Sequence, residues 1–286
     1  GTDDGTDGGD VLLDAKSIAA TVGVANSTVT GKADAGVGLS VALNIVGAGA
    51  TAEIEDTAVI TNAANLGLSA IVSPTTRTKA QAGATSDVAV GGAVAITIGD
   101  SIATARLGTG GATTIGGNLT IDAAEVSGTI YTTADGEAAG KDVGVGAAIA
   151  IAITDDEAFA TSERALTVGG TDASKIEATT EARVETTAKA SAMGVKSGST
   201  GGSTTADGQT SAQRDHATTT ASSAGSSAGR GRDSGTDTDT SASTSDGAVG
   251  IAAAIAVNTS DVTAQAAVLS NLTAAGSLDI HSGANA

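Results

Sequence analysis

Aspartate residues occur at matching places along this chain, on either side of a recurring aliphatic stretch. Four precede such a stretch and three follow one: Asp34, Asp87, Asp142 and Asp246 lie before, and Asp100, Asp156 and Asp261 lie after. Calcium binds oxygen ligands, so carboxylates that stack at the corners of a regular fold would be able to share calcium ions. Aspartate also favours turns, because its side chain hydrogen-bonds to the nearby backbone. The pattern leaves both interpretations open, a set of calcium sites or a set of turns.

Few other residues suggest chemistry. The segment 225–229 matches G-x-S-x-G, but a nucleophile elbow needs a strand before the serine and a helix after it, and this match lies in Gly/Ser/Thr-rich sequence. His216 and His281, the only histidines, have no evident metal-binding partner. A polysaccharide-active β-helix enzyme would need aromatic side chains for sugar stacking, and Tyr131 and Phe159 are the only aromatic residues. We predict no catalytic residue and no enzymatic activity, with calcium as the one candidate cofactor.

The charge balance limits the partners. The chain has 14 basic and 32 acidic residues, a formal net charge of −18. Such a chain is repelled by nucleic-acid phosphates and by anionic membrane surfaces. The longest apolar run, from Val143 to Ile153, is well short of the roughly 18 residues that a membrane-spanning helix needs. We therefore expect neither nucleic-acid binding nor direct membrane insertion.

The aliphatic stretches form an internal repeat. Val41 and Val94 are 53 residues apart, Val94 and Ile149 are 55 apart, and Ile149 and Ile255 are 106 apart, which is twice 53. Each stretch alternates a β-branched or aliphatic residue with a small one, which is typical of a strand. The four stretches run from Val37 to Ile45, from Val90 to Ile98, from Val143 to Ile153 and from Val249 to Val257.

Two further strands are expected in each repeat. The segment 8–15 matches 116–123, and a looser strand such as 52–60 lies between this strand and the aliphatic one. We predict an all-β fold, an elongated parallel β-solenoid built from repeats of roughly 53 residues. If three strands of ordinary length make a rung of about 18 residues, the chain outside residues 196–246 forms about 13 rungs.

The alternation also predicts which side chains are buried. In the stretch from Val143 to Ile153, we expect the Val and Ile side chains to enter an aliphatic core. The intervening Gly and Ala side chains are too small for an ordinary solvent-facing surface. We expect a loop, a second sheet or a neighbouring molecule to cover them.

We expect residues 1–286 to form a single solenoid segment cut from a longer array, because the repeat is interrupted at both ends. Residues 196–246 break the pattern with Gly, Ser, Thr, Ala and Asp and almost no large aliphatic residues. This segment is interpreted either as an inserted loop or as low-complexity strands that continue the solenoid.

The combination of Gly-Val-Gly-x-x-Val-Ala-x-x-Ile strands, a following Gly-Gly-x-Leu-x-Ile-x-Ala strand and a period in the fifties resembles a known group. It is similar to the repeat region of large bacterial surface proteins of the filamentous-haemagglutinin type, particularly leukotoxin-like filamentous adhesins and giant autotransporter passengers. This resemblance implies export to the bacterial cell surface, a right-handed parallel β-helix, and a role in adhesion or as a stalk or filament. It supplies no catalytic residues.

The expected function is therefore non-catalytic attachment between cells or to a surface. The expected partners are neighbouring repeats of the same chain, further copies through lateral or end-to-end association, and another cell surface. The alternatives are a module that binds a regular target such as a polymer or ice and, less favoured, a β-helix enzyme that acts on polysaccharides.

Overall fold

The chain folds almost entirely into β-strands. The computed structural model describes residues 8–31, 34–193, 236–245 and 249–285. Strands account for 83% of these residues, and no helix occurs among them. The described part of the chain thus contains no helix that could cross a membrane. The all-β class predicted from the alternating pattern is confirmed.

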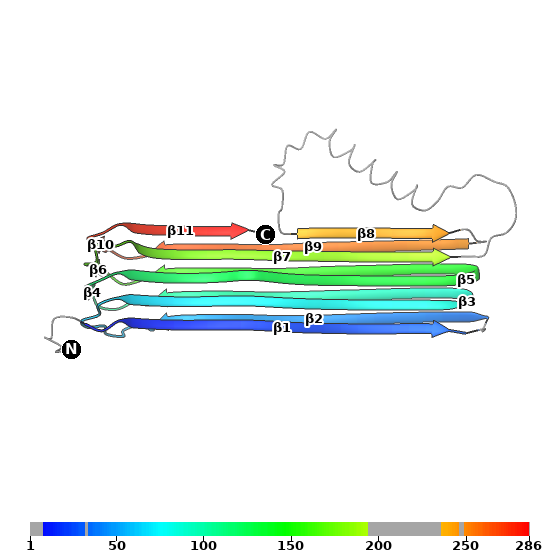
Figure 1. Cartoon of the computed structure of the whole chain (residues 1–286), viewed down its shortest axis with the longest axis horizontal. Coiled ribbons are helices and arrows are strands. Elements are labelled where there is room, and N and C mark those ends of the chain that lie inside the picture. Colours follow the sequence, from blue (N-terminus) through cyan, green and yellow to red (C-terminus); the bar gives the residue numbers. More distant parts are fainter. Residues whose placement is uncertain (1–7, 32–33, 194–235, 246–248, 286) are drawn as a thin grey trace, which may run out of the picture.

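The long strands run out and back across the molecule, and we call each such passage a rung (Figure 1). Rung one consists of β1 (Val11–Thr30) and β2 (Ala35–Ile54). Rungs two and three are the long strands β3 (Leu66–Leu107) and β5 (Leu119–Ser162), each of which reverses direction near its middle. Rung four consists of β7 (Ser174–Met193) and β9 (Val249–Val268).

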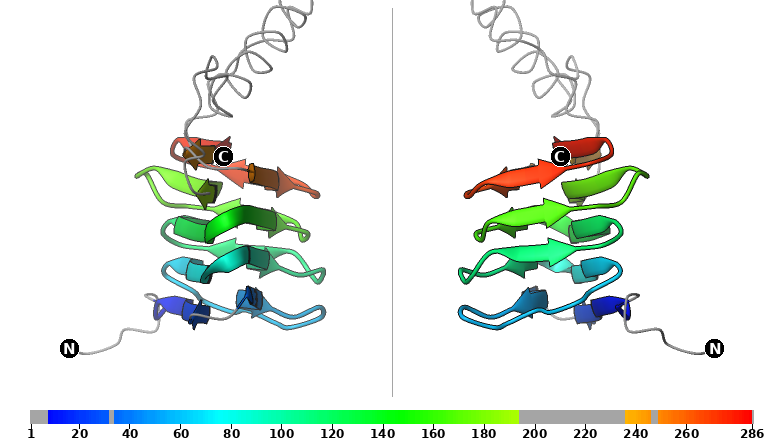
Figure 2. Two further views of the ribbon diagram at one scale, coloured as in Figure 1. Left: turned by 90° about the vertical axis from the view of Figure 1, so that its right-hand side faces the viewer. Right: turned by 90° about the vertical axis from the view of Figure 1, so that its left-hand side faces the viewer.

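Neighbouring rungs pair in parallel and form two sheets. The outgoing halves, 11–30, 66–86, 119–140 and 174–193, make the first sheet, and the returning halves, 35–54, 88–107, 143–162 and 249–268, make the return sheet. Val11 pairs with Leu66, 55 residues later, and Ala35 pairs with Val88, 53 residues later. Seen end-on, the rungs stack as flattened levels (Figure 2). This arrangement of long parallel strands is compatible with a β-solenoid.

The expected rung of about 18 residues is wrong. Each half-rung is a continuous strand of about 20 residues, several times the usual strand length. The segment 52–60, expected to be a separate strand, begins as the last residues of β2 and continues into a turn. The described chain therefore makes four broad rungs in place of about 13 narrow ones.

Short strands close one end of the rungs. β4 (Thr113–Ile115), β6 (Leu166–Val168) and β10 (Leu272–Ala274) form a separate parallel sheet at this end (Figure 1). With the two long sheets they enclose a core of large aliphatic side chains. Leu66, Leu68, Leu119, Ile121 and Ile176 are all fully buried there.

Two strands lie end to end on the upper edge of β7. β11 (Leu278–Asn285) pairs with 174–181, and β8 (Thr236–Ser245) pairs with 184–193. β8 lies within the low-complexity segment 196–246, so at least its residues form a strand of the first sheet, as one of the two interpretations expected. The rest of that segment, apart from β8, lies outside the described residues.

Away from the short strands, alanine is the commonest core residue, and it is joined by buried threonines such as Thr97, which hydrogen-bonds to Thr78 and Thr132. Ala80, Ala95, Ala134, Ala150 and Ala188 are completely buried between the first and return sheets. The two backbones approach so closely that a Cβ added to Gly91 would overlap the carbonyl oxygen of Glu137 in the facing strand. Small side chains are therefore a steric requirement of the narrow interior.

The small-residue face of the return sheet is the buried one. The expectation that something covers this face is confirmed, and the cover is the first sheet of the same chain. The expectation that the Val and Ile side chains enter the core is wrong, because Val41 and Ile255 are 66% and 52% exposed. These branched side chains are too bulky for the space between the sheets, so they project from the outer surface.

Candidate binding face

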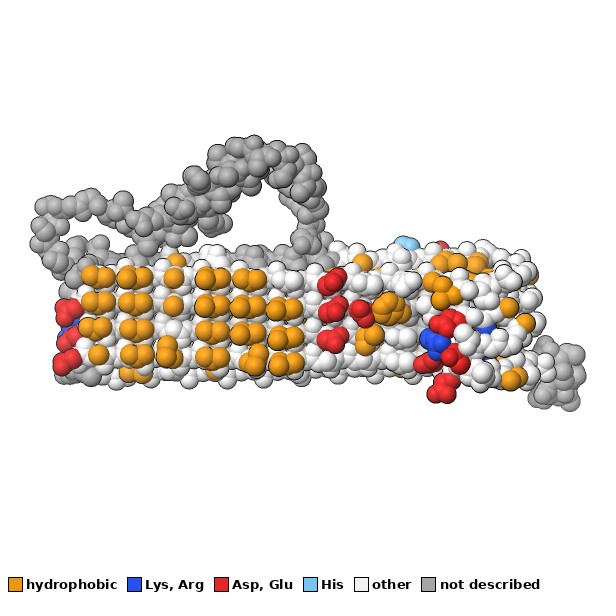
Figure 3. All heavy atoms as spheres, turned by 180° about the vertical axis from the view of Figure 1, so that it is seen from behind, with side chains coloured by type: hydrophobic (Ala, Val, Ile, Leu, Met, Phe, Trp, Pro, Cys, Tyr) orange, Lys and Arg blue, Asp and Glu red, His pale blue; other side chains and the backbone are white. Residues whose placement is uncertain are grey.

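The outer surface of the return sheet carries a regular grid of aliphatic side chains. Alternate positions along each strand point outward, and the parallel register places equivalent positions above one another in six columns. We call these positions the Val/Ile face (Figure 3). They are Ala35, Val37, Leu39, Val41, Leu43 and Ile45; Val88, Val90, Gly92, Val94, Ile96 and Ile98; Val143, Val145, Ala147, Ile149, Ile151 and Ile153; and Val249, Ile251, Ala253, Ile255, Val257 and Thr259.

This face is large for an uncovered apolar surface. Leu39 and Ile45 are 64% and 68% exposed, and no described residue packs over the grid. With columns about 6.8 Å apart and rungs about 4.8 Å apart, the face covers roughly 40 Å by roughly 19 Å, or about 750 Å². Monomeric soluble proteins usually expose apolar patches no larger than about 300–600 Å², and larger ones mark interaction sites.

The outer surface of the first sheet has the opposite character. Arg77, Tyr131 and Glu185 stack there on neighbouring rungs, with the Arg77 guanidinium carbon 5.3 Å from the centre of the Tyr131 ring. Lys175 forms ion pairs with Asp122 and Glu177. Rung one is the exception on this surface, because Ile18 and Val22 are exposed there. The outer surface of the first sheet is thus polar and charged over the other rungs, whereas the return sheet is apolar over all four.

A column of aspartates borders the Val/Ile face. The register stacks Asp100, Asp155 and Asp261 next to the last aliphatic column. Asp155 therefore occupies the place that the sequence pattern assigned to Asp156, which points into the core instead. The pKa of the neighbouring Glu157 is raised by burial and by the negative charges of this column.

The other predicted calcium ligands lie at the turn beside the first aliphatic column. Asp34, Asp87 and Asp142 occupy equivalent places there, and Lys141 forms a 2.8 Å ion pair with Asp87. Asp246 lies outside the described residues. In the part of the chain that the structure describes, no three acidic or histidine side chains are grouped closely enough to hold a metal ion. Calcium binding stays a prediction.

Two carboxyl groups face each other inside rung three, where the sequence suggested no site. Glu125 and Asp156 are each only 2% exposed. Neither oxygen of Glu125 meets a hydrogen-bond donor among the described groups, and its neighbouring titratable group is the Asp156 carboxyl. Burial and the Asp156 charge raise the pKa of Glu125 to about 9, and burial also raises the pKa of Asp156. At neutral pH, Glu125 is therefore protonated.

The backbone near Glu125 is irregular, and the sequence contains a signal of it. The pairing of β3 with β5 shifts between Val72 and Thr75, where Pro74 has no N–H to donate. The pairing of β5 with β7 shifts between Glu125 and Gly128. A Cβ on Gly128 would collide with the Glu125 carboxyl group. Pro74, the only proline, marks this irregularity in the sequence, although its spacing from Glu125 does not by itself predict a contact.

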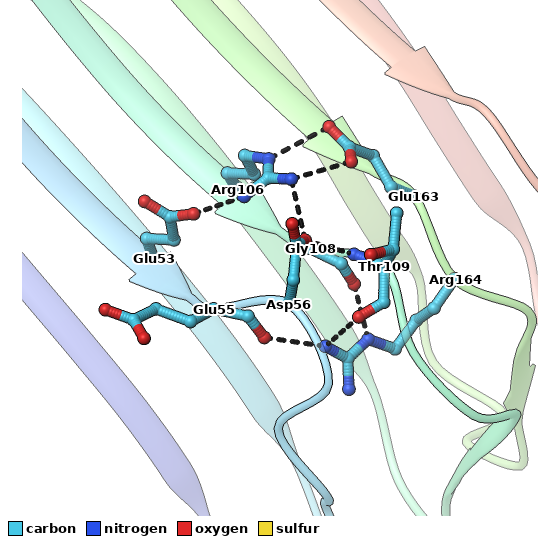
Figure 4. Close-up of polar contacts among 8 residues, drawn as sticks. All are labelled: Glu53, Glu55, Asp56, Arg106, Gly108, Thr109, Glu163 and Arg164. Carbon is cyan, nitrogen blue, oxygen red and sulfur yellow. Dashed lines mark hydrogen bonds and ion pairs between the residues drawn. The ribbon is translucent and has the colours of Figure 1, made fainter.

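Two arginines join three rungs at the corner near the short strands (Figure 4). Arg106 forms ion pairs with Glu53 of rung one, with Asp56 of the turn after it, and with Glu163 just beyond rung three. Hydrogen bonding to Glu163 raises the pKa of Arg106, and the amide of Thr109 lowers the pKa of Asp56. These contacts fasten consecutive rungs in register.

Arg164 lies deeper in the corner than Arg106 does, because Arg164 is only 1% exposed. Its Nε donates to the Gly108 carbonyl at 2.7 Å and its Nη1 donates to the Ala58 carbonyl at 2.6 Å. Its Nη2 reaches the Glu55 carbonyl at 3.2 Å and the Thr109 carbonyl at 3.3 Å. Burial lowers the pKa of Arg164. The guanidinium satisfies turn carbonyls from two rungs, so we interpret the corner as structural.

Comparison with family models, with curated proteins and with solved structures gives no match to this chain.

Proposed function

We propose that this chain is a non-catalytic structural and adhesive segment of a large secreted or cell-surface bacterial protein, and that it mediates attachment between cells or to a surface. Its finer architecture in this proposal is a right-handed parallel β-helix with a repeat of roughly 53 residues. The 53-residue spacing of Ala35 and Val88, which pair in neighbouring rungs, supports that period.

The observation that carries the proposal is the Val/Ile face. Its aliphatic side chains contribute to no core of the described chain, because the alanine-filled interior lies on the other side of the same strands. Removing apolar surface from water is favourable by roughly 25 cal/mol per Å², so covering even part of this face supplies binding energy. Attachment through a broad face needs no pocket and no catalytic group.

Attachment can be tested with two matched variants of rung three. Ile151→Asp places a charge on the Val/Ile face, and Thr133→Asp places the same charge on the polar face between Lys79 and Thr187. We expect Ile151→Asp to lower retention of the 286-residue chain on bacterial cells or on an alkyl-coated surface by about 10-fold or more, because the charge must be desolvated on contact. Equal retention of both variants and the unmodified chain would contradict the proposal.

A second candidate function is binding to a regular solid such as ice or a crystalline polymer. The two-dimensional periodicity of the Val/Ile face favours it, because equivalent side chains repeat both along the strands and across the rungs. In this case the chain should slow ice recrystallisation or adsorb to polymer crystals, and Ile151→Asp should abolish the effect. Attachment to cells without either activity would exclude this candidate.

The proposal includes the absence of turnover on polysaccharides. The buried carboxyl pair, Glu125 and Asp156, cannot reach a polymeric substrate because both groups are sealed between the sheets. We expect no release of reducing ends from polysaccharides incubated with the pure chain. Release that disappears in Asp155→Asn or in Glu157→Gln would contradict this part of the proposal.

A further inference from the structure

The Val/Ile face has the size of one side of a specific protein–protein interface. Its area of about 750 Å² compares with about 800 Å² per partner in complexes of standard size. The face extends over all four rungs, so a partner of matching shape would cover it in a single contact.

We propose that a second copy of this chain covers the Val/Ile face, so that two molecules stack face to face through their return sheets. This inference rests on the proposed function in one respect, because both assign binding to the Val/Ile face. A second copy has the same column spacing and the same rung spacing. Once one aliphatic side chain fits between two of its neighbours, the rest of the grid therefore fits as well. Sheets that pack face to face in this way lie about 10 Å apart with interdigitating side chains.

The distribution of polar groups supports this partner. Pairing through the return sheets leaves both first sheets, with Arg77, Tyr131 and Glu185, on the outside in water. The result is a layered structure with large aliphatic side chains in the middle and charged surfaces outside, the arrangement that buries apolar sheet faces in domains. The Val/Ile face contains no aromatic or charged residue, which disfavours a sugar or an ionic ligand as the partner.

Charge determines the conditions under which the pair forms. Each copy has a formal net charge of −18, and Asp100, Asp155 and Asp261 border the Val/Ile face. Two copies therefore repel each other at low ionic strength. Salt limits the range of this repulsion, because the screening length is about 10 Å at 0.1 M and about 3 Å at 1 M. The gain from burying apolar surface is not weakened by salt. Association should become tighter as salt is added, which is opposite to the behaviour of an interface held by ion pairs.

The test is sedimentation equilibrium of the 286-residue chain and the two rung-three variants. We expect dimers whose dissociation constant falls as NaCl is raised from about 50 mM to about 500 mM. Ile151→Asp, which buries a charge in both copies, should weaken the dimer by about 100-fold or more. Thr133→Asp should change it by less than about 3-fold. Circular dichroism melting of dilute samples establishes that both variants are folded.

Several outcomes would overturn the inference. One is a chain that stays monomeric at about 100 μM in high salt, well above the dissociation constant expected for an interface of this size. Another is a dimer that both variants weaken equally. Binding of the monomer to uncharged phosphatidylcholine vesicles would identify a lipid surface as the partner instead. Loss of pairing with retained cell attachment overturns this inference alone, whereas pairing without attachment overturns the proposed function alone.

Discussion

Ala150 and Ile151 are neighbours in the chain whose side chains lie in opposite environments. Ala150 is completely buried between the two sheets, while Ile151 points outward on the Val/Ile face. Around Ala150 the interior holds only the methyl groups of alanine residues, and the exterior holds the branched aliphatic side chains. Hydrophobicity alone therefore does not separate inside from outside in this chain. Side-chain volume does.

Ala150→Glu tests this assignment. We expect it to lower the free energy of unfolding by several kcal/mol, because a charge is forced into a close-packed contact and loses its hydration. Ile151→Glu is the matched control and should change the stability of the monomer by about 1 kcal/mol or less. Denaturant unfolding in dilute solution measures both. Similar losses from the two variants would mean that the sheets are not packed as described.

The buried pair Glu125 and Asp156 predicts a pH dependence of stability. Between about pH 5 and pH 9 the folded chain keeps a proton on Glu125 that the unfolded chain has released, because the pKa is 4.5 ordinarily and about 9 in the fold. The folded state binds more protons, so the free energy of unfolding falls as pH rises through this window. The slope is at most about 1.4 kcal/mol per pH unit.

Glu125→Gln should remove most of this dependence. The amide stays neutral at every pH, so the variant should be more stable than the unmodified chain near pH 8 and similar to it near pH 5. Glu137→Gln, at an exposed position of the same strand, is the control and should leave the slope unchanged. Chemical unfolding at a series of pH values measures these slopes. A slope that survives in Glu125→Gln would assign the titration to another group.

At the level of elements, the corner that contains Arg106 and Arg164 is expected to hold the turns in place. Arg164→Met should lower the free energy of unfolding by about 3 kcal/mol or more, because the buried Gly108 carbonyl and the partly buried Ala58 carbonyl both lose a charged donor. Arg106→Gln should change stability by about 1 kcal/mol, since its ion pairs are partly exposed to solvent. Thermal unfolding measures both variants. A lower melting temperature for Arg106→Gln than for Arg164→Met would show that Arg106 is the more important of the two arginines.

The strands themselves were predictable from sequence, but their lengths were not. The stretches that begin at Val37, Val90, Val143 and Val249 all lie in return strands, and the register stacks them as their spacing predicts. Alternation continues far beyond each aliphatic stretch, through Gly, Thr and Asp residues that elsewhere indicate a turn. In this fold those residues lie within 20-residue strands, because the neighbouring rungs of the same sheet pair with their backbone and the facing sheet leaves room only for small inner side chains.

The candidate site was predictable only in part. The Val and Ile positions of the repeat were evident, whereas their exposure was not, because sequence periodicity identifies two faces without stating which is covered. Two glycines do indicate which face is covered. Gly91 and Gly136 occupy the inner face in facing strands, where a Cβ would overlap the opposite backbone. The Glu125 and Asp156 pair could not be predicted, since it depends on how the two sheets align across the core.

For the whole molecule, the stacked carboxylates oppose folding at low ionic strength. Asp155 lies between Asp100 and Asp261, and like charges on adjacent strands destabilise by roughly 0.2–1 kcal/mol per pair. We expect Asp155→Asn to raise the melting temperature in chelator and low salt. Asp135→Asn, which removes a charge beside Lys189, should not raise it.

The same variants test the prediction of calcium binding. At matched ionic strength, millimolar calcium should raise the melting temperature of the unmodified chain more than that of Asp155→Asn, because an ion that binds only the folded form stabilises it by mass action. An equal melting temperature in calcium and in chelator would leave only the turn-forming role for these aspartates.

The width of the rungs has a consequence for how the chain uses its length. Each passage of 53 to 55 residues, as from Val11 to Leu66 or from Ala35 to Val88, adds only one strand spacing to the height of the stack, about 4.8 Å. That is about 0.1 Å of height per residue, against about 3.3 Å for an extended chain. A spacer that holds a binding domain far from a cell would gain much more length per residue from an extended chain. Each passage does add a full row of outward aliphatic side chains, so polypeptide length is converted here into surface area and hardly into distance.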